Sequence, residues 1–151
     1  MRKVMALATI AVLMSVAVAA MAAEVEVKML NKGAAGMMVF EPALVTIAPG
    51  DSVKFVATDK SHNAETIKGM IPDGAKPFAG KMNEDVTVTF DQAGVYGVKC
   101  MPHYGMGMVS LIVVGKPGNE ETARAVVHAG KAKTVFAGLF DKLAAERTAA
   151  K

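Results

Sequence analysis

The chain has 151 residues and a formal net charge of +3, from 17 basic and 14 acidic side chains. Two of the basic residues, Arg2 and Lys3, lie in an N-terminal segment that we expect to be removed, and without residues 1–22 the net charge is +1. A nearly neutral protein lacks the basic excess of a nucleic-acid binder, so no nucleic-acid partner is expected. The remaining 129 residues suit one domain with one core.

The N-terminal segment has the three parts of a secretory signal peptide. Arg2 and Lys3 precede an apolar run from Val4 to Ala19, and residues 20–22 place alanine on both sides of a methionine before Ala23. A membrane anchor is the alternative, since the run approaches spanning length, but its Ala-rich composition and small-residue ending favour cleavage. We therefore predict a cleaved signal peptide over residues 1–22, export to the periplasm and no membrane attachment afterwards.

Short strands separated by turns follow this leader. Apolar and polar residues alternate from Glu24 to Met29, which is the pattern of a half-buried strand. Further strands are predicted at Met38–Phe40, Leu44–Ile47, Ser52–Ala57, Val86–Phe90, Val95–Cys100 and Met108–Val114, with a weaker one at His62–Ile67. The pattern predicts an all-β fold, an antiparallel Greek-key β-sandwich over residues 23–116. Tyr96 stands where sandwiches often place a corner tyrosine, whose hydroxyl bonds to upstream backbone.

The last part of the chain, residues 117–151, changes to Ala-rich sequence. It predicts two C-terminal α-helices, Glu120–Ala129 and Lys133–Ala149, with Asn119 as the N-cap of the first and Gly130 as its stop. In the second helix an apolar stripe recurs at helical spacing: Val135, Phe136, Leu139, Phe140 and Leu143. We expect this stripe to pack on the sandwich, which makes the helices an extension of the same domain.

The most distinctive chemistry lies in one short segment between two predicted strands. It contains Cys100, His103, Met106 and Met108. A lone cysteine in an exported protein cannot form an intramolecular disulfide, and coordination to a metal would protect it as a thiolate. Thiolate, imidazole and thioether ligands match a blue copper site, which combines one cysteine, two histidines and a weak axial methionine.

Such a site needs a second imidazole, and only His62 and His128 remain. His62 lies in a loop after the Ser52–Ala57 strand, which a sandwich can bring close to the later loop. His128 is predicted near a helix C-terminus, where a partly charged imidazole is favoured. We therefore assign His62 to the metal and leave His128 out. Met106 and Met108 remain open alternatives, because blue copper loops use more than one spacing between histidine and methionine.

Four protein ligands fill the coordination sphere, which favours electron transfer over catalysis. Structural zinc would prefer a closed set of cysteine and histidine without methionine. A nucleophilic cysteine is disfavoured because Cys100 and His103 are too tightly tethered to leave an obvious substrate approach. Single buried Cys and Met residues are usually structural, but their joint spacing with an upstream histidine argues against coincidence. A periplasmic copper storage or chaperone protein is the alternative function, and it would favour Cu(I) and exchange it readily.

At these residues the sequence resembles the pseudoazurins, a family within the cupredoxins. The resemblance covers essentially all of the mature chain, from Val25 to the helical tail, and includes residues 25–33, 38–43, 59–63, 70–75 and the whole 100–108 loop. Two helices after the sandwich distinguish this family from the smaller plastocyanins and amicyanins. The resemblance implies one type 1 copper ion, Cu(I)/Cu(II), held by His62, Cys100, His103 and Met108, so that Met106 lies outside the ligand set.

The resemblance also implies a function. Pseudoazurins are soluble periplasmic electron carriers, not enzymes, and often donate electrons to copper nitrite reductase through an apolar patch ringed by lysines. By that match the ring here comprises Lys32, Lys60 and Lys99, extended by Lys76 and Lys81, with Ala79 at a position where the family often has lysine. We expect a monomer whose electron leaves through His103, because an apolar surface beside it would bring a partner close.

Pro102 predicts a feature of the thiolate. Proline has no backbone N–H, so Pro102 cannot donate a hydrogen bond to the sulfur of Cys100. Fewer donors leave the thiolate electron-rich and favour Cu(II). The backbone N–H of Asn63 is the donor that we expect at the sulfur.

Overall fold

The computed structural model describes residues 21–151, so the predicted signal peptide lies almost entirely outside the described residues. The strands are β1 (Glu24–Gly33), β2 (Gly36–Glu41), β3 (Leu44–Ile47), β4 (Ser52–Val56), β5 (Glu65–Thr66), β6 (Val86–Thr89), β7 (Gly94–Lys99) and β8 (Val109–Val114). A 3₁₀ turn, η1 (Tyr104–Met106), lies between β7 and β8. Two helices, α1 (Glu120–Arg124) and α2 (Ala132–Ala149), follow β8. Neither helix in this part of the chain combines the length and apolar character needed to cross a membrane.

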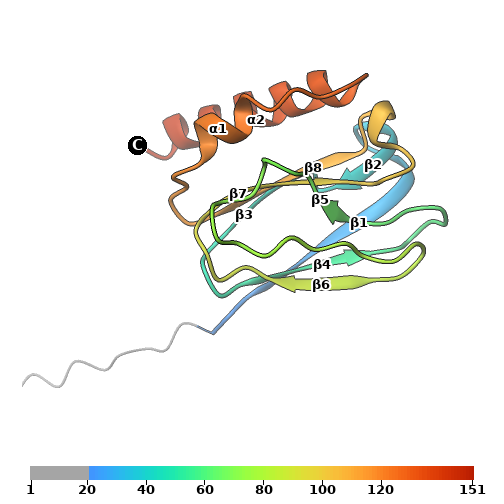
Figure 1. Cartoon of the computed structure of the whole chain (residues 1–151), viewed down its shortest axis with the longest axis horizontal. Helices are drawn as coiled ribbons and strands as arrows, with labels where there is room; N and C mark the ends of the chain where they lie inside the picture. The colour runs from blue at the N-terminus through green and yellow to red at the C-terminus, as the bar shows by residue number, and fades with distance from the viewer. Residues whose placement is uncertain (1–20) are drawn as a thin grey trace, which may run out of the picture.

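Two four-stranded sheets pack face to face, in the orders β2-β1-β4-β6 and β3-β8-β7-β5 (Figure 1). The predicted β-sandwich is confirmed, but the expectation of purely antiparallel pairing is wrong. β1 pairs in parallel with β4, and β3 pairs in parallel with β8. The reason is the path of the chain. After β2 it crosses to the other sheet to form β3, and when it comes back to the first sheet it runs through β4 in the same direction as through β1.

The alternating sequence of the first sheet supplies its core face. Val27 and Met29 of β1 and Val53 and Phe55 of β4 are fully buried, while their neighbours along each strand are more exposed. Side chains of a strand point alternately to the two faces, so this pattern follows directly from the sequence. Burial of each such side chain contributes roughly 1.5–3 kcal/mol to folding.

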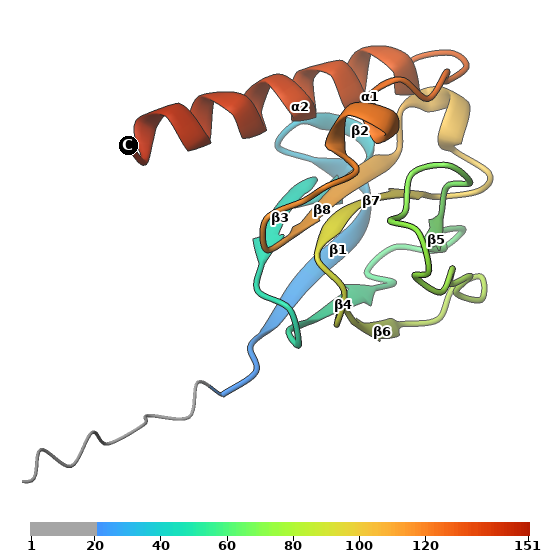
Figure 2. The ribbon, with the colours of Figure 1, turned by 60° about the vertical axis from the view of Figure 1, so that its left-hand side comes forward.

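β7 and β8 are covered on both faces, which explains their nearly continuous apolar sequence. Ile112 and Val114 of β8 face the core between the sheets. The alternate β8 residues pack in a second cluster with the buried side of α2, formed by Val109, Leu111, Val113, Phe136, Phe140 and Leu143. This confirms the predicted packing of the helical stripe on the sandwich. Figures 1 and 2 show from two sides that α2 runs along one face of the sandwich.

The first predicted helix is wrong at its C-terminus, because α1 ends at Arg124 and not at Ala129. The β-branched residues Val126 and Val127 follow, and such residues lose side-chain freedom in a helix. His128 therefore lies in the link between the helices and not in the last turn of α1, where the sequence predicts it.

Asn119 occupies the predicted N-cap position of α1, but its side chain makes no capping hydrogen bond. Its amide instead bonds both backbone groups of Val95: Oδ1 accepts from the N–H at 2.7 Å and Nδ2 donates to the carbonyl at 2.9 Å. Asn119 thus attaches α1 to β7. The corner tyrosine is confirmed, since the Tyr96 hydroxyl donates to the carbonyl of Gln92 at 2.8 Å.

Candidate metal centre

The loop between β7 and β8 folds back on itself at one end of the sandwich. The N–H of Cys100 donates to the carbonyl of Met108 at 3.0 Å, and the N–H of Met108 donates to the carbonyl of His103 at 3.2 Å. Gly107 adopts a left-handed conformation, with φ of 89°, that closes the turn after η1. These bonds bring Cys100, His103 and Met108 together.

His62 reaches the same end of the sandwich from the loop after β4. Ser61 and Asn83 both have left-handed backbones, with φ of 72° and 64°. The N–H of Ser61 donates to Asn83 Oδ1 at 2.5 Å, and the N–H of Asn83 donates to the carbonyl of His62 at 2.9 Å. Such conformations persist only where the surroundings over-determine them, so these bonds fix the loop that holds the buried His62.

Three donor atoms of this site converge. Nδ1 of His62 and Nδ1 of His103 lie 3.1 Å apart, and Sγ of Cys100 lies 3.6 Å and 3.5 Å from them. A point equidistant from the three atoms lies about 2 Å from each, close to the roughly 2.0–2.3 Å of first-row metal bonds to imidazole nitrogen and thiolate sulfur. Within residues 21–151 this is the one group of three or more His, Cys, Asp or Glu side chains able to hold a metal.

The hydrogen bond on the far side of the His62 ring fits metal binding. Nε2 of His62 lies 2.9 Å from Oδ1 of Asn31. An amide oxygen can only accept, so Nε2 carries the proton and Nδ1 presents its lone pair to the centre. Burial, together with repulsion from His103, lowers the pKa of His62 and keeps it neutral, against an opposing effect of Asp59. The sequence gives no signal for this role of Asn31.

Cys100 is fully buried. Burial raises the pKa of its thiol, while the backbone N–H groups of Asn63 and His103 act in the opposite direction and Glu65 raises it further. The effect of Asn63 on this pKa agrees with the donor that the sequence predicts, and the similar effect of the His103 backbone is not predicted from the sequence. A buried thiolate needs a cation or hydrogen-bond donors to be stable, and a metal ion held by Cys100 and the two histidines would supply the cation.

The two candidate methionines differ in burial. Met108 is 0% exposed and belongs to the same buried cluster as Cys100. Met106 is 50% exposed on η1. The difference arises because Met108 directly precedes β8 and points with it into the sandwich, whereas Met106 lies on the outer turn of the loop.

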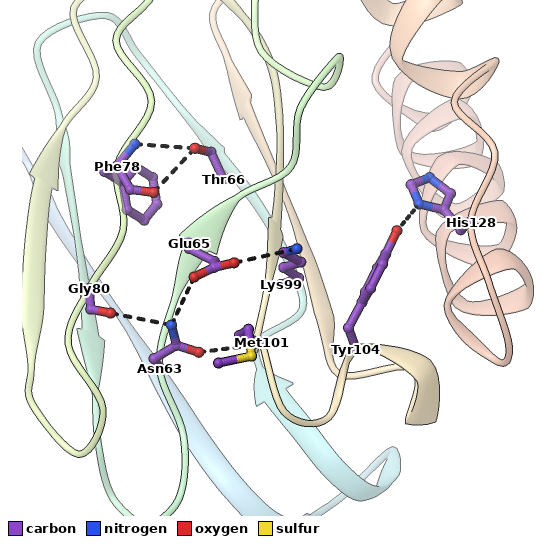
Figure 3. Close-up of polar contacts among 9 residues, drawn as sticks. All are labelled: Asn63, Glu65, Thr66, Phe78, Gly80, Lys99, Met101, Tyr104 and His128. Carbon is purple, nitrogen blue, oxygen red and sulfur yellow. Dashed lines mark hydrogen bonds and ion pairs between the residues drawn. The ribbon is translucent and has the colours of Figure 1, made fainter.

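The structure does not bring His128 to this centre, in agreement with its omission from the predicted ligands. Its ring stacks on Phe136, with ring centroids 4.5 Å apart, and Nδ1 lies 2.5 Å from the hydroxyl of Tyr104 (Figure 3). The lysines of the predicted ring also differ from one another. Lys32 and Lys60 are exposed, whereas Lys99 pairs with Glu65 at 3.4 Å and lies 5.1 Å from the centre of the Tyr104 ring.

Comparisons with known proteins agree with this centre. Residues 27–115 match the family of copper binding proteins described as plastocyanin/azurin. The chain is 56% identical over 128 residues to a pseudoazurin of Methylorubrum extorquens, with 84% of this chain and 86% of the relative covered. It is 50% identical over 127 residues to a pseudoazurin of Paracoccus pantotrophus, with 83% and 88% covered. The chain belongs to the pseudoazurin family.

A solved structure agrees with this family membership. The crystal structure of pseudoazurin from Methylobacterium extorquens AM1 matches with a TM-score of 0.77 at 55% identity, and the match covers 80% of this chain and 98% of the other. Pseudoazurins are blue copper electron carriers, not enzymes, and each carries one type 1 copper ion. The cupredoxin fold predicted from the sequence is confirmed, and the group of His62, Cys100 and His103 suits that ion.

Proposed function

We propose that this pseudoazurin holds its copper with His62, Cys100, His103 and Met108. The convergence of two Nδ1 atoms and one Sγ, each about one metal bond length from a common point, carries the proposal. Met108 would supply the thioether because it is buried with Cys100, while Met106 is half exposed. This set of thiolate, imidazoles and thioether is the one that type 1 copper uses.

Bound copper supplies a one-electron couple, and the chain holds its ligands still. Asn31 orients the imidazole of His62, and Asn63 joins the loop of His62 to the loop of Cys100: its Oδ1 accepts from the N–H of Met101 at 2.8 Å. A ligand set that fits both oxidation states imperfectly and cannot relax needs little rearrangement when the charge changes. Rigid loops thereby favour fast electron transfer.

The mature protein is proposed to be a monomeric carrier in the periplasm. The charged start, apolar run and small-residue site of residues 1–22 support removal of this segment on export. The sandwich of residues 23–116 and the helices of residues 117–151 share a packed cluster, which supports a single domain.

The proposed electron acceptor is an acidic periplasmic redox enzyme such as copper nitrite reductase. Exposed apolar side chains lie in the loop of His103, where Met101 is 56% and Met106 50% exposed, and on β2, where Met37 is 55% exposed and lines a hollow together with Met106. Such a patch supports close, transient docking, and the exposed Lys32 and Lys60 would steer an acidic partner. Lys99 completes the proposed ring, but its charge is partly balanced by Glu65.

Addition of Cu(II) to the purified exported protein tests the ligand set. We expect an intense blue colour that a mild reductant abolishes and an oxidant restores. Met108→Leu should change the spectrum and the reduction potential, whereas Met106→Leu should change neither by much. A colourless complex would contradict the blue copper proposal, and tight, readily exchanged Cu(I) without reversible redox would favour a storage or chaperone role.

Charge reversal tests the docking surface. The double variant Lys32→Glu, Lys60→Glu should slow association with an acidic partner several-fold at low ionic strength, and less at high salt. Adding Lys99→Glu should slow association further, because it reverses a third charge and leaves Glu65 without its partner. Stopped-flow measurement of electron transfer across a salt series checks this. Equal rates for wild type and the double variant at low salt would refute steering.

A further inference from the structure

We propose that His128 is a positioning residue for electron transfer, which acts through Tyr104 to hold the copper loop from the helix side. Residues 128–135, which join the link after α1 to the first turn of α2, form what we call the clasp. This role presupposes the copper ligands proposed above, because Tyr104 directly follows the ligand His103.

The clasp contacts the loop at three successive places. The Tyr104 hydroxyl lies 2.5 Å from Nδ1 of His128, and the N–H of Lys131 donates to the carbonyl of Gly105 at 3.0 Å. Farther along, Gly107 packs so closely on α2 that an added Cβ would lie 2.9 Å from a methyl of Val135. Figure 2 shows the link and η1 at the same end of the sandwich, and Figure 3 shows Tyr104 rising from η1 towards His128.

Gly130 makes this approach possible. Its φ is +58°, and a Cβ at this position would lie 2.4 Å from the carbonyl oxygen of Gly105. No side chain fits at that distance, and non-glycine residues rarely adopt this backbone conformation. The sequence predicts Gly130 as the end of the first helix, but α1 ends at Arg124 and Gly130 is instead the point at which the clasp touches the loop.

The hydrogen bond between Tyr104 and His128 has a defined direction. Burial lowers the pKa of His128 and raises the pKa of Tyr104, so both are neutral near neutral pH. A neutral Tyr104 hydroxyl donates to Nδ1 of His128. His128 is itself held by stacking on Phe136, and Lys99 lies over the Tyr104 ring. Tyr104 is thus restrained at its hydroxyl and over its ring.

This restraint bears on the neighbouring ligand. A movement of His103 would displace the backbone of Tyr104, which directly follows it. The contacts of Tyr104 and Gly105 with the clasp oppose that displacement. Groups that orient a metal ligand through such contacts typically alter activity by about 10–100-fold when removed. We expect an effect near the lower end, because the clasp acts one residue away from His103.

Substitutions at both ends of the hydrogen bond test the role. His128→Leu keeps apolar contact with Phe136 but removes the acceptor, Tyr104→Phe removes the donor, and His128→Asn retains an acceptor close to the position of Nδ1. Leu143→Ala is the matched control, since Leu143 is buried under α2 beside Thr46 and Val113, at the far end of β8. It loosens the helix packing without touching the copper loop.

Four readouts are needed: the absorption spectrum of the Cu(II) form, the electron self-exchange rate, the thermal midpoint of unfolding, and amide hydrogen exchange of Lys131 in copper-free protein. His128→Leu and Tyr104→Phe should each slow electron self-exchange about tenfold and alter the absorption spectrum of the Cu(II) form. Both should also speed hydrogen exchange of the Lys131 amide. His128→Asn should restore most of these properties. Leu143→Ala should lower the thermal midpoint and leave the spectrum unchanged.

Unchanged self-exchange, spectrum and Lys131 protection in both His128→Leu and Tyr104→Phe would overturn the proposal. Equal changes in Leu143→Ala would also overturn it, because the effect would then reflect loss of stability. A wild-type protein without blue colour would refute the copper ligands. The exchange of the Lys131 amide in copper-free protein would still report separately on the clasp.

Discussion

The two flanks of the copper loop are held by different chemistry. On the sheet side one buried amide, Asn63, binds Met101, and donates to Glu65 at 3.1 Å and to the carbonyl of Gly80 at 3.2 Å (Figure 3). On the helix side a tyrosine hydroxyl, a backbone N–H and glycine contacts hold the loop, and they depend on where α2 lies. The sheet flank is therefore sensitive to one side chain, whereas the helix flank is sensitive to the packing of a whole element.

The largest expected effect comes from two phenylalanines of α2. Phe136 and Phe140 are each 2% exposed in the same cluster, but Phe136 stacks on His128 while Phe140 carries Arg124 over its ring. Phe136→Ala and Phe140→Ala should each lower the free energy of unfolding by about 3–5 kcal/mol, measured by urea denaturation of copper-free protein.

Only Phe136→Ala should also change the absorption of the Cu(II) form, because it removes the support of His128. The two variants are matched in residue type, burial and helix, so they separate stability from loop geometry. Identical spectra for both variants would show that the helix flank does not reach the copper loop.

On the sheet side of the copper loop we expect a smaller loss of stability than for the two phenylalanines, together with a direct effect on the loop. Asn63→Ala should lower the free energy of unfolding by about 2–3 kcal/mol, since it removes the three hydrogen bonds of a buried amide, including the one that accepts from the N–H of Met101. Gln92→Ala, which removes an exposed amide bonded to the carbonyl of Asp73, should change it by less than about 0.5 kcal/mol. A loss for Asn63→Ala no greater than that of Gln92→Ala would contradict the anchoring role.

Between the two flanks, Pro102 bears on the thiolate itself. Pro102→Ala supplies a new N–H, and if it donates to Sγ of Cys100 the thiolate loses electron density and the reduction potential rises. A hydrogen bond contributes about 0.5–1.5 kcal/mol, which corresponds to roughly 20–60 mV for one electron. Protein-film voltammetry measures this shift, with Met101→Ala as the control that alters an exposed neighbour without a new donor. An unchanged or lower potential would refute this account.

The smallest effect is a dependence on pH from the helix flank. Burial lowers the pKa of His128 below its ordinary value of 6.5, so the unfolded chain binds this proton more readily than the folded protein. The contribution of His128 to stability is therefore complete above pH 6.5 and declines as the pH falls below it. Copper-free wild type should lose more stability on acidification than His128→Asn, as urea denaturation between neutral and acidic pH can show. If the difference in unfolding free energy between wild type and His128→Asn does not change with pH, this role of His128 in the pH dependence is wrong.

Much of the fold and of the site can be predicted from local sequence. Alternation places the strands, the apolar stripe from Val135 to Leu143 places α2, and the short spacing from Cys100 to His103 brings two donors to one loop, because these patterns depend on neighbours along the chain. His62 follows because His128 offers a less suitable position. The choice of Met108 over Met106 needs the family resemblance, since both thioethers have the same chemistry.

Only the tertiary structure decides which distant residues support that site. Asn31 meets His62 and His128 meets Tyr104 across β-sheet and helix packing, and neither pair carries a spacing that periodicity could reveal. The parallel pairing of β1 with β4 and the early end of α1 likewise follow from the path of the chain and from packing around the link. The sequence by itself determined the donors and the layers, because these are local properties. The supports of the copper loop are contacts between distant segments, and they arise only when the sandwich and its helices are assembled.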